Sequence, residues 1–419
     1  MISPACELRG VTSLRADRRT VLGVAGSALV GGLFTAATRG TTDASTASDA
    51  TSATWPMARY DAAGTGHAPD MVGPASDVAV RWKHQAYGHV ADPPSPVLHD
   101  GRLYYSAADR FLVVDADDGT VHHELSNGTY YSSPCLLTDT AYANETLAVA
   151  DSTGLVGVNP TGGVDLFGRR WPNRWRYPDR ERDAHAPPPR SRSTPSPVVA
   201  DDALVYAGPI GDEDAVVALD PSSAERRWRA GSYPSPRRPA VAEDSVFVVS
   251  GRGRIRALDL DDGSELWRAT THEPTVNAPA VANGRLYLTD RWNVYAFDAT
   301  TGAQVWRRPM DVSVGTPPVV AGRTLYVATE LSGGPLLALD AATGETLWTA
   351  PYGNRNSTPV VAGDTLYLPS HYDLYALDAA TGTERWRFKA AGSVSTPVVA
   401  DGRVYAAGGN VLYALEAQR

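Results

Sequence analysis

The chain has 419 residues, 43% of them hydrophobic, and 47 acidic against 38 basic residues give it a net charge of -9. An acidic chain argues against wholesale nucleic-acid binding, because surfaces that bind phosphate backbones are basic. Its two cysteines, Cys6 and Cys135, are too few for a disulfide scaffold.

The N-terminal segment predicts export. The motif Asp-Arg-Arg-Thr-Val-Leu at residues 17–22 leads into an apolar, glycine-rich run that ends near Ala37. This pattern resembles a twin-arginine signal, so we expect residues 1–37 to be a signal that directs the chain to the periplasm, cell surface or exterior. Cleavage near Ala37 is favoured; an uncleaved anchor is the alternative and the only expected route to membrane association. Residues 38–54, mostly Thr, Ser, Ala and Asp, predict a flexible tether.

From residue 55 onward the chain is a repeat. Each unit opens with a proline followed by small apolar residues, and every interval between these prolines is 38 to 42 residues, apart from one of 63. The prolines are Pro96, Pro134, Pro197, Pro239, Pro279, Pro318, Pro359 and Pro397. Short alternating strands with tight turns predict antiparallel meanders, and four strands in roughly 40 residues is the spacing of propeller blades. The sequence therefore predicts an all-β, eight-bladed β-propeller over residues 55–419.

A turn and a tryptophan recur inside each unit. The copy at residues 374–386 reads Leu-Tyr-Ala-Leu-Asp-Ala-Ala-Thr-Gly-Thr-Glu-Arg-Trp. The Asp can accept bonds from the turn amides, and the Gly tolerates a left-handed backbone. The large ring four residues after the Gly should pack between neighbouring blades. This docking role is expected of Trp228, Trp267, Trp306, Trp348 and Trp386, with His123 and Phe167 in the weaker early units.

The last unit stops after three strands, so a fourth strand must come from elsewhere. The segment at residues 78–83 has no strands of its own before it, yet its Arg-Trp-Lys matches the fourth strand of other units. We expect it to complete the last blade and to place Trp82 in a docking position. Closing the ring in this way leaves no open sheet edge in that blade.

The pattern Ala-Leu-Asp-x-x-Thr-Gly-x-x-x-Trp resembles the tryptophan-docking repeat of quinoprotein dehydrogenases, which also occurs in non-catalytic relatives such as BamB. The likeness runs from Trp55 to the end of the chain and implies an eight-bladed propeller. In the dehydrogenases the central channel holds the quinone PQQ with a calcium ion, an Asp base, a Trp floor and a ring of adjacent cysteines. This chain has no adjacent cysteines and no matching metal-binding set. No cofactor, metal site or catalytic residue is therefore expected, and PQQ with calcium is the alternative.

Two features outside the repeat are candidate binding elements. The loops that lead into the innermost strands should surround one mouth of the channel, and they carry Arg192, Arg237, Arg238, Asn277, Arg355 and Asn356. These residues predict a funnel that attracts anions, unless each Arg pairs with a neighbouring carboxylate. The second feature is an insert at 168–193 with eight arginines and the aromatic residues Trp171 and Trp175. Such residues are frequent at binding hot spots, although the insert could also be a Pro-stiffened loop.

The sequence as a whole favours an exported, non-catalytic propeller that acts as a protein-interaction or assembly scaffold. Its partner would be an unidentified protein or an anionic ligand at the loop-lined channel mouth, and no nucleic acid is expected. The alternative is an enzyme, either a PQQ-dependent quinoprotein oxidoreductase or a carbohydrate-active protein.

Overall fold

The computed structural model describes residues 53–86, 93–107, 109–126, 130–138, 140–166, 169–179, 194–274, 277–330, 334–353 and 357–418. The predicted signal and most of the predicted tether lie outside these residues. Every regular element in the described part is a β-strand. No helix there is long and apolar enough to span a bilayer.

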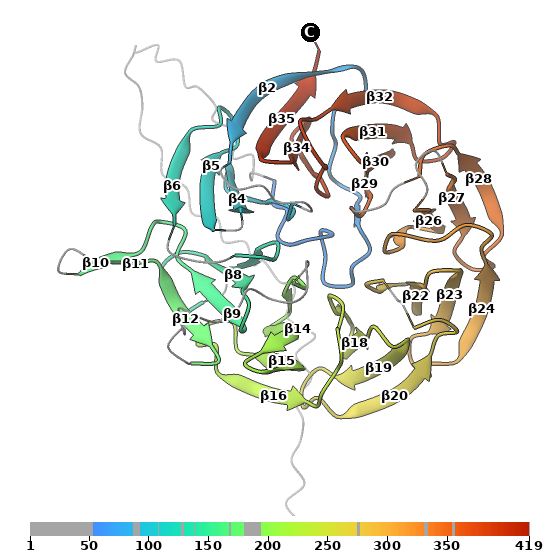
Figure 1. Cartoon of the computed structure of the whole chain (residues 1–419), viewed down its shortest axis with the longest axis horizontal. Coiled ribbons are helices and arrows are strands. Elements are labelled where there is room, and N and C mark those ends of the chain that lie inside the picture. Colours follow the sequence, from blue (N-terminus) through green and yellow to red (C-terminus); the bar gives the residue numbers. More distant parts are fainter. Residues whose placement is uncertain are drawn as a thin grey trace, which may run out of the picture. The chain divides into compact units, whose positions relative to one another are not determined.

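Eight four-stranded antiparallel sheets stand around a central axis, which confirms the predicted eight-bladed propeller (Figure 1). Each blade runs from a short inner strand to an outer strand at the circumference. The strands of blades 1 to 4, from inside to outside, are β3 (Val97–His99), β4 (Arg102–Ala107), β5 (Arg110–Asp115) and β6 (Val121–Leu125); β7 (Cys135–Leu137), β8 (Thr146–Ala150), β9 (Leu155–Val158) and β12 (Asn173–Tyr177); β13 (Val198–Ala200), β14 (Ala203–Ile210), β15 (Glu213–Leu219) and β16 (Arg226–Ala230); and β17 (Ala240–Ala242), β18 (Ser245–Val249), β19 (Arg254–Asp259) and β20 (Glu265–Thr270).

Blades 5 to 8 have the same order of strands. They are β21 (Ala280–Ala282), β22 (Arg285–Thr289), β23 (Asn293–Asp298) and β24 (Gln304–Pro309); β25 (Val319–Ala321), β26 (Thr324–Ala328), β27 (Leu336–Asp340) and β28 (Thr346–Ala350); β29 (Val360–Ala362), β30 (Thr365–Ser370), β31 (Asp373–Asp378) and β32 (Glu384–Lys389); and β33 (Val398–Ala400), β34 (Arg403–Gly408), β35 (Val411–Ala417) and β2 (Val78–Gln85). Two short elements complete the set, β1 (His67–Ala68) beside β29 and the hairpin of β10 (Val164–Leu166) with β11 (Arg169–Trp171).

The last blade is closed by the N-terminal region, as predicted. Strand β2 pairs antiparallel with β35, from Val78 opposite Ala417 to Gln85 opposite Val411. Figure 1 shows β2 at the outer edge of this blade, beside β35 and close to the C-terminus. Because β2 and β35 are more than 300 residues apart in sequence, the pairing locks the ring shut only when both ends of the chain are in place.

Residues 55–68, which we call the inner segment, run around the axis inside the ring and cover the inner strands. Backbone amides of the inner strands donate to carbonyls of this segment in six blades: Leu98 to Trp55, Leu136 to Pro56, Val241 to Ala62, Val281 to Ala63, Val320 to Thr65 and Val361 to Gly66. Strand β1 at its end pairs in parallel with β29. The inner segment therefore satisfies inner-edge donors that would otherwise be unpaired in a narrow channel.

Docking tryptophans join six of the blades to the next one. The indole Nε1 donates to the carbonyl of the residue after the turn Asp in the following blade: Trp82 to Ala116, Trp228 to Leu260, Trp267 to Ala299, Trp306 to Ala341 and Trp348 to Ala379, at 2.7 to 3.3 Å. Trp386 faces blade 8, whose outer strand comes from the N-terminal region, and donates to Pro74 at 2.9 Å. A buried indole N–H needs an acceptor, and for these six tryptophans it lies on the neighbouring blade or, for Trp386, on the segment that leads into its outer strand.

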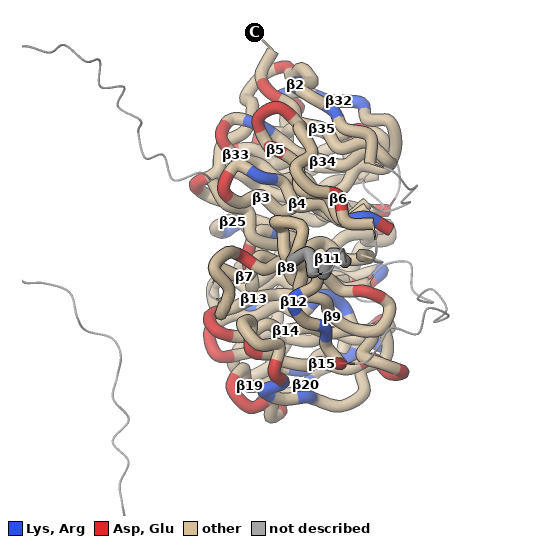
Figure 2. Tube along the Cα trace, turned by 90° about the vertical axis from the view of Figure 1, so that its left-hand side faces the viewer, with Lys and Arg blue, Asp and Glu red and all other residues tan. Residues whose placement is uncertain are grey.

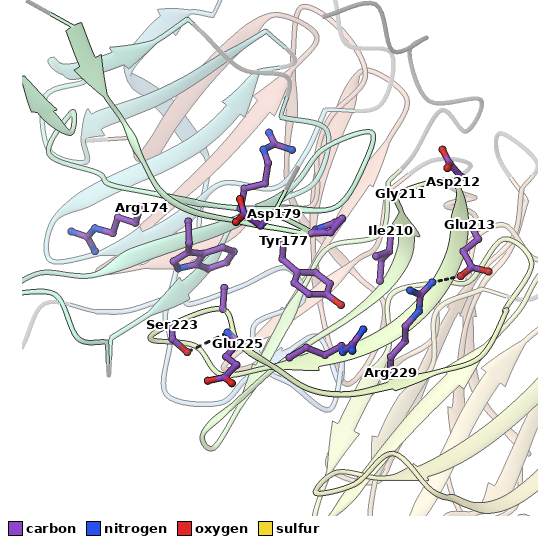
Figure 3. A pocket seen from close by; sticks show the side chains of 15 residues that line it. Arg174, Tyr177, Asp179, Ile210, Gly211, Asp212, Glu213, Ser223, Glu225 and Arg229 are labelled. Carbon is purple, nitrogen blue, oxygen red and sulfur yellow. Dashed lines mark hydrogen bonds and ion pairs between the residues drawn. The ribbon is translucent and has the colours of Figure 1, made fainter. Parts of the chain in front are cut away.

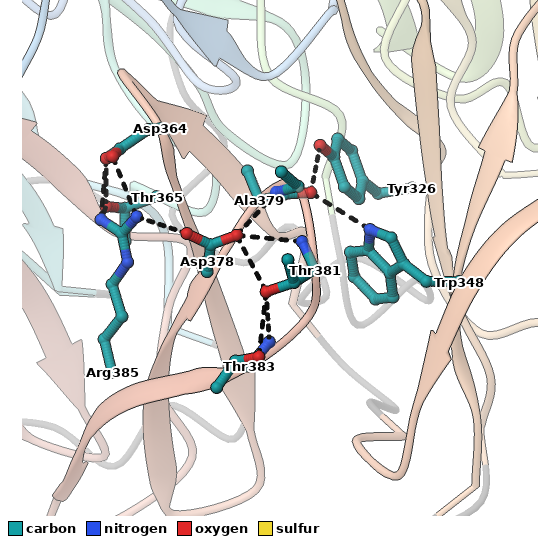
Figure 4. Close-up of polar contacts among 10 residues, drawn as sticks. Tyr326, Trp348, Asp364, Thr365, Asp378, Ala379, Thr381, Thr383 and Arg385 are labelled. Carbon is teal, nitrogen blue, oxygen red and sulfur yellow. Dashed lines mark hydrogen bonds and ion pairs between the residues drawn. The ribbon is translucent and has the colours of Figure 1, made fainter.

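The turn that receives the indole has the geometry that its sequence predicts. In blade 7, Oδ1 of Asp378 accepts from the amides of Ala380 and Thr381, and Gly382 has a φ of +74° (Figure 4). A Cβ on Gly382 would lie 2.6 Å from Cζ3 of Trp348. The Gly is therefore needed twice, for its backbone conformation and for the space that the indole fills.

One detail of blade 2 differs from the expectation. Phe167 lies outside the described residues, and the fourth strand of this blade is β12, so the docking position belongs to Trp175, which sits opposite Gly157. Part of the predicted insert is therefore blade structure. The strand was misplaced because the residues after the turn form the extra hairpin of β10 and β11 before the chain returns to the sheet.

We predict that Gly382→Ala destabilises the propeller by about 2–4 kcal/mol, because it adds a clash with Trp348 to the strain of a left-handed Ala. The matched control is Gly402→Ala, which has a φ of +73° and no atom within 4 Å of the added Cβ. The control should cost only about 1 kcal/mol. Denaturant unfolding of both variants checks this, and equal losses would contradict the docking role of Trp348.

Candidate functional site

The loops before the inner strands meet at one face of the ring, as expected. Each blade begins and ends at this face, because its four strands alternate in direction. A cavity of about 360 Å³ opens here, lined by residues from the entry loops of all eight blades and by Ala58 and Arg59 of the inner segment. The lining is mainly Pro, Ser and Thr.

Three of the predicted binding residues line this cavity: Arg237, Arg238 and Asn277. Asn277 is fixed in place, since its Nδ2 donates to Thr289 Oγ1 at 3.0 Å and to the carbonyl of Thr316 at 3.2 Å. Arg237 is only half-buried, and burial lowers its pKa.

The other candidates are not brought to this cavity by the described structure. Arg192, Arg355 and Asn356 lie outside the described residues. Trp171 belongs to β11, whose side chains are likewise outside the description, and Trp175 lies in the outer strand of blade 2.

Arg59 is a site residue that the sequence analysis missed. It is 4% exposed and has a φ of 63°. Its Nη1 donates to the carbonyl of Pro279 at 2.9 Å, and its Nη2 donates to the carbonyl of Pro318. The only sequence signal was its place in the lead-in Trp-Pro-Met-Ala-Arg, and nothing there shows that this lead-in enters the channel.

Arg238 lies beside Arg59 at the base of the cavity and is 7% exposed. Its Nη2 donates to the carbonyl of Asp61 at 2.8 Å and its Nη1 to the carbonyl of Pro239 at 3.2 Å. The Nε of Arg59 and the Nε of Arg238 are buried, and neither has a hydrogen-bond partner among the described residues.

These two guanidinium groups lack a compensating ion pair within the described structure. The nearest carboxylate, Asp61, accepts from the amide of Thr65 at 2.8 Å and from the Thr65 hydroxyl. Burial, and then the charge of Arg238, lower the pKa of Arg59 to about 9, whereas Asp61 acts in the opposite direction. Burial likewise lowers the pKa of Arg238 to about 10. An anion in the cavity would offset the cost of these buried charges.

The cavity carries positive charge, from Arg59 and Arg238, although the chain as a whole is negatively charged. Figure 2 shows acidic residues in many turns of the propeller, in line with the net charge of -9. A cationic pocket inside an acidic surface favours entry of a localised anionic group and disfavours long polyanions such as nucleic acid.

The described residues do not fit a calcium-bound quinone. Calcium takes six to eight oxygen ligands, usually with several carboxylates. Asp214 is the one carboxylate among the described cavity residues, and its Oδ2 accepts from the amide of Ser235 at 3.0 Å. The described part of the chain contains no group of three His, Cys, Asp or Glu residues able to hold a metal ion. The two guanidinium groups suit the binding of a carboxylate, but they cannot coordinate the calcium ion.

Aromatic side chains surround the same face. Trp292, between β22 and β23, is 39% exposed, and Tyr372, between β30 and β31, is 55% exposed. Each of these two turns is hydrogen-bonded to the loop that leads to the next blade. The amide of Met310 donates to the carbonyl of Trp292, and the amide of Ala390 donates to the carbonyl of Tyr372. The guanidinium of Arg291 lies 5.3 Å from the ring centre of Trp292. Exposed aromatic and Arg side chains of this kind are typical of protein interfaces.

We predict that Arg238→Met changes the stability of the empty protein by no more than about 1 kcal/mol, because removal of an uncompensated buried charge offsets the loss of the hydrogen bonds to the carbonyls of Asp61 and Pro239. Arg323→Met, at a side chain that is 87% exposed, is the control and should have no effect. Thermal unfolding without added anions checks the prediction. A loss of about 3–5 kcal/mol would mean that Arg238 has a buried ionic partner.

Comparisons with known proteins agree with the geometry. The family described as outer membrane protein assembly factor BamB matches residues 73–209, 212–293, 290–373 and 336–419. Among curated proteins, no sequence matches this chain.

Solved structures show the same fold at low identity. A quinohemoprotein alcohol dehydrogenase from Comamonas testosteroni superposes with a TM-score of 0.67 and 13% identity, over 87% of this chain and 81% of that one. BamB from Moraxella catarrhalis gives 0.58 and 15%, over 81% and 99%. The computationally designed protein Ika8 gives 0.62 and 12%, over 79% and 98%. With the repeat, the blades and the family match together, this chain belongs to the BamB family of PQQ-like repeat propellers.

Proposed function

We propose that this chain is an exported, non-catalytic scaffold that captures a partner protein at the mouth of the propeller. The partner inserts an acidic segment into the central cavity, where its carboxylates meet Arg59 and Arg238. The observation that carries this proposal is the pair of buried guanidinium groups without an ion pair in the described structure.

The energetics favour a carboxylate as the bound group. The Arg fork matches carboxylate geometry, and a charge-assisted hydrogen bond is roughly twice as strong as a neutral one. The protein has already lost the hydration of both guanidinium groups on folding, so binding does not incur that cost again. The Nε–H groups are the donors of these two side chains that have no acceptor among the described residues.

The surroundings support a protein partner. A cavity of about 360 Å³ accommodates one or two side chains, and the exposed Trp292 and Tyr372 at the same face could contact the rest of a partner surface. The described lining of the cavity offers hydroxyl and guanidinium groups that can bind a partner. Its one carboxylate, Asp214, already accepts a hydrogen bond from a backbone amide. Export rests on the twin-arginine motif and remains a proposal.

The proposal is tested by calorimetric titration of the chain without its signal with a short Glu-rich peptide. Binding should weaken roughly 10- to 100-fold in Arg238→Gln, the equivalent of losing a charge-assisted bond of about 1.5–3 kcal/mol. Arg323→Gln, which changes an exposed guanidinium, should bind as the unchanged protein does. Failure of every acidic peptide to bind, or equal affinity of both variants, would contradict the proposal.

The alternative function is tested on the same sample. PQQ with calcium is added, and reduction of an artificial dye is followed with a panel of alcohols and sugars as substrates. Turnover would show an oxidoreductase and would overturn the non-catalytic proposal.

A further inference from the structure

The interface between blades 2 and 3 departs from the docking rule of the other blades. Trp175 has the docking position in β12, but its Nε1 is buried and has no hydrogen-bond partner in the described structure. Six other tryptophans in the same position donate to the next blade. The acceptor that the rule would assign to Trp175 is the carbonyl of Pro221, the residue after the turn Asp.

Two substitutions explain the difference: this interface has a Gly opposite the tryptophan where the other blades have an Ala, and an Ala in the turn of the next blade where the others have a Gly. The cross-strand neighbour of every docked tryptophan is an Ala, as Ala376 is for Trp386, but the neighbour of Trp175 is Gly157. A Cβ on Gly157 would lie 2.3 Å from Cε2 of Trp175, so the indole rests directly on this glycine. In the turn of blade 3, Ala224 with a φ of +57° replaces the usual Gly. The indole has therefore settled on its own blade, away from the neighbour.

The displaced indole leaves a groove between the two blades. Its volume is about 810 Å³, and its walls come from β12, from the turn between β14 and β15, and from the turn between β15 and β16 (Figure 3). The blades stay joined at the face of the mouth, because Gly211 donates to the carbonyl of Thr153 at 2.8 Å. The volume is within the range of ligand-binding pockets.

The groove has an aromatic wall. Trp175 and Tyr177 are two residues apart in β12, so both face blade 3, and Ile210 lies on the opposite side. One face of the indole covers Gly157, which leaves the other face for a ligand.

Among the lining charges without an ion pair in the described structure, carboxylates outnumber guanidinium groups by three to two. Arg176 is bound to Asp151 at 2.7 Å and Arg229 to Glu213. Arg174 is held by the carbonyls of Asn144 and Glu145. Asp179, Asp212 and Glu225 also line the groove and have no ion pair among the described residues. Two lining guanidinium groups, those of Arg174 and Arg226, likewise have no ion pair there.

We propose that this groove binds a basic peptide segment, with a Lys or Arg side chain of a partner lying between the aromatic wall and Ile210. The aliphatic stem packs on the apolar surfaces, the cation lies over an aromatic face, and the free carboxylates bind the charged end. This site is independent of the central cavity and has the opposite charge preference.

The test is titration of the chain without its signal with a short Arg-rich peptide, beside a Glu-rich peptide of equal length. We expect the Arg-rich peptide to bind, and Glu225→Gln to weaken it about tenfold. Glu345→Gln is the matched control, since Glu345 follows the turn Gly of blade 6 as Glu225 follows Ala224, and its turn has the same hydrogen bonds. The control should bind as the unchanged protein does.

A second variant restores the docking rule. Gly157→Ala with Ala224→Gly should move the indole toward Pro221, narrow the groove, remove its aromatic wall and abolish binding of the Arg-rich peptide, while Glu-rich peptides still bind the central cavity. Loss of binding in this variant, with its thermal unfolding temperature unchanged or higher, supports the proposal. Absence of binding to the unchanged protein, equal weakening by both Gln substitutions, or binding that survives the restored docking would each overturn it.

Discussion

The propeller depends on the packing of each blade against the next, and at six of the eight interfaces this packing includes a hydrogen bond from a docking indole. A four-stranded blade cannot bury both of its faces alone, so the ring is stable only if each blade covers its neighbour. The bond fixes the distance between blades, and the turn Gly provides the space for the ring. The same constraint explains ring closure, because Trp82 reaches Ala116 of blade 1 only when β2 completes blade 8.

The repeat in the sequence was sufficient to predict the eight blades, their inner strands and the closing strand, because one phrase carries both the turn and its packing partner. It failed at blade 2, where an extra hairpin separates the turn from Trp175. Arg59 was missed for another reason: its burial depends on the inner segment passing through the ring, a long-range arrangement with no local pattern. Arg237 and Arg238 could be placed at the mouth from the sequence because they directly precede the inner strand of blade 4.

The parts of the molecule that serve stability and those that suit binding are separate. Six indoles satisfy their N–H groups across blade interfaces, whereas Trp175 and the Nε atoms of Arg59 and Arg238 are among the buried side-chain donors without a partner in the described structure. The inner segment links both roles, since it covers the inner strands with its backbone and places Arg59 in the cavity. Because dehydrogenases and BamB share this fold, the fold alone does not define a function, and the function has to be inferred from the site.

The central claim is that Arg59 and Arg238 hold unpaired donors ready for an anion. The most direct measurement is the nuclear magnetic resonance spectrum of arginine Nε–H groups, assigned by Arg59→Lys and Arg238→Lys. The account predicts two resonances protected from solvent exchange that both shift when a Glu-rich peptide is added. Two resonances that exchange freely, or that stay in place at saturating peptide, would contradict it.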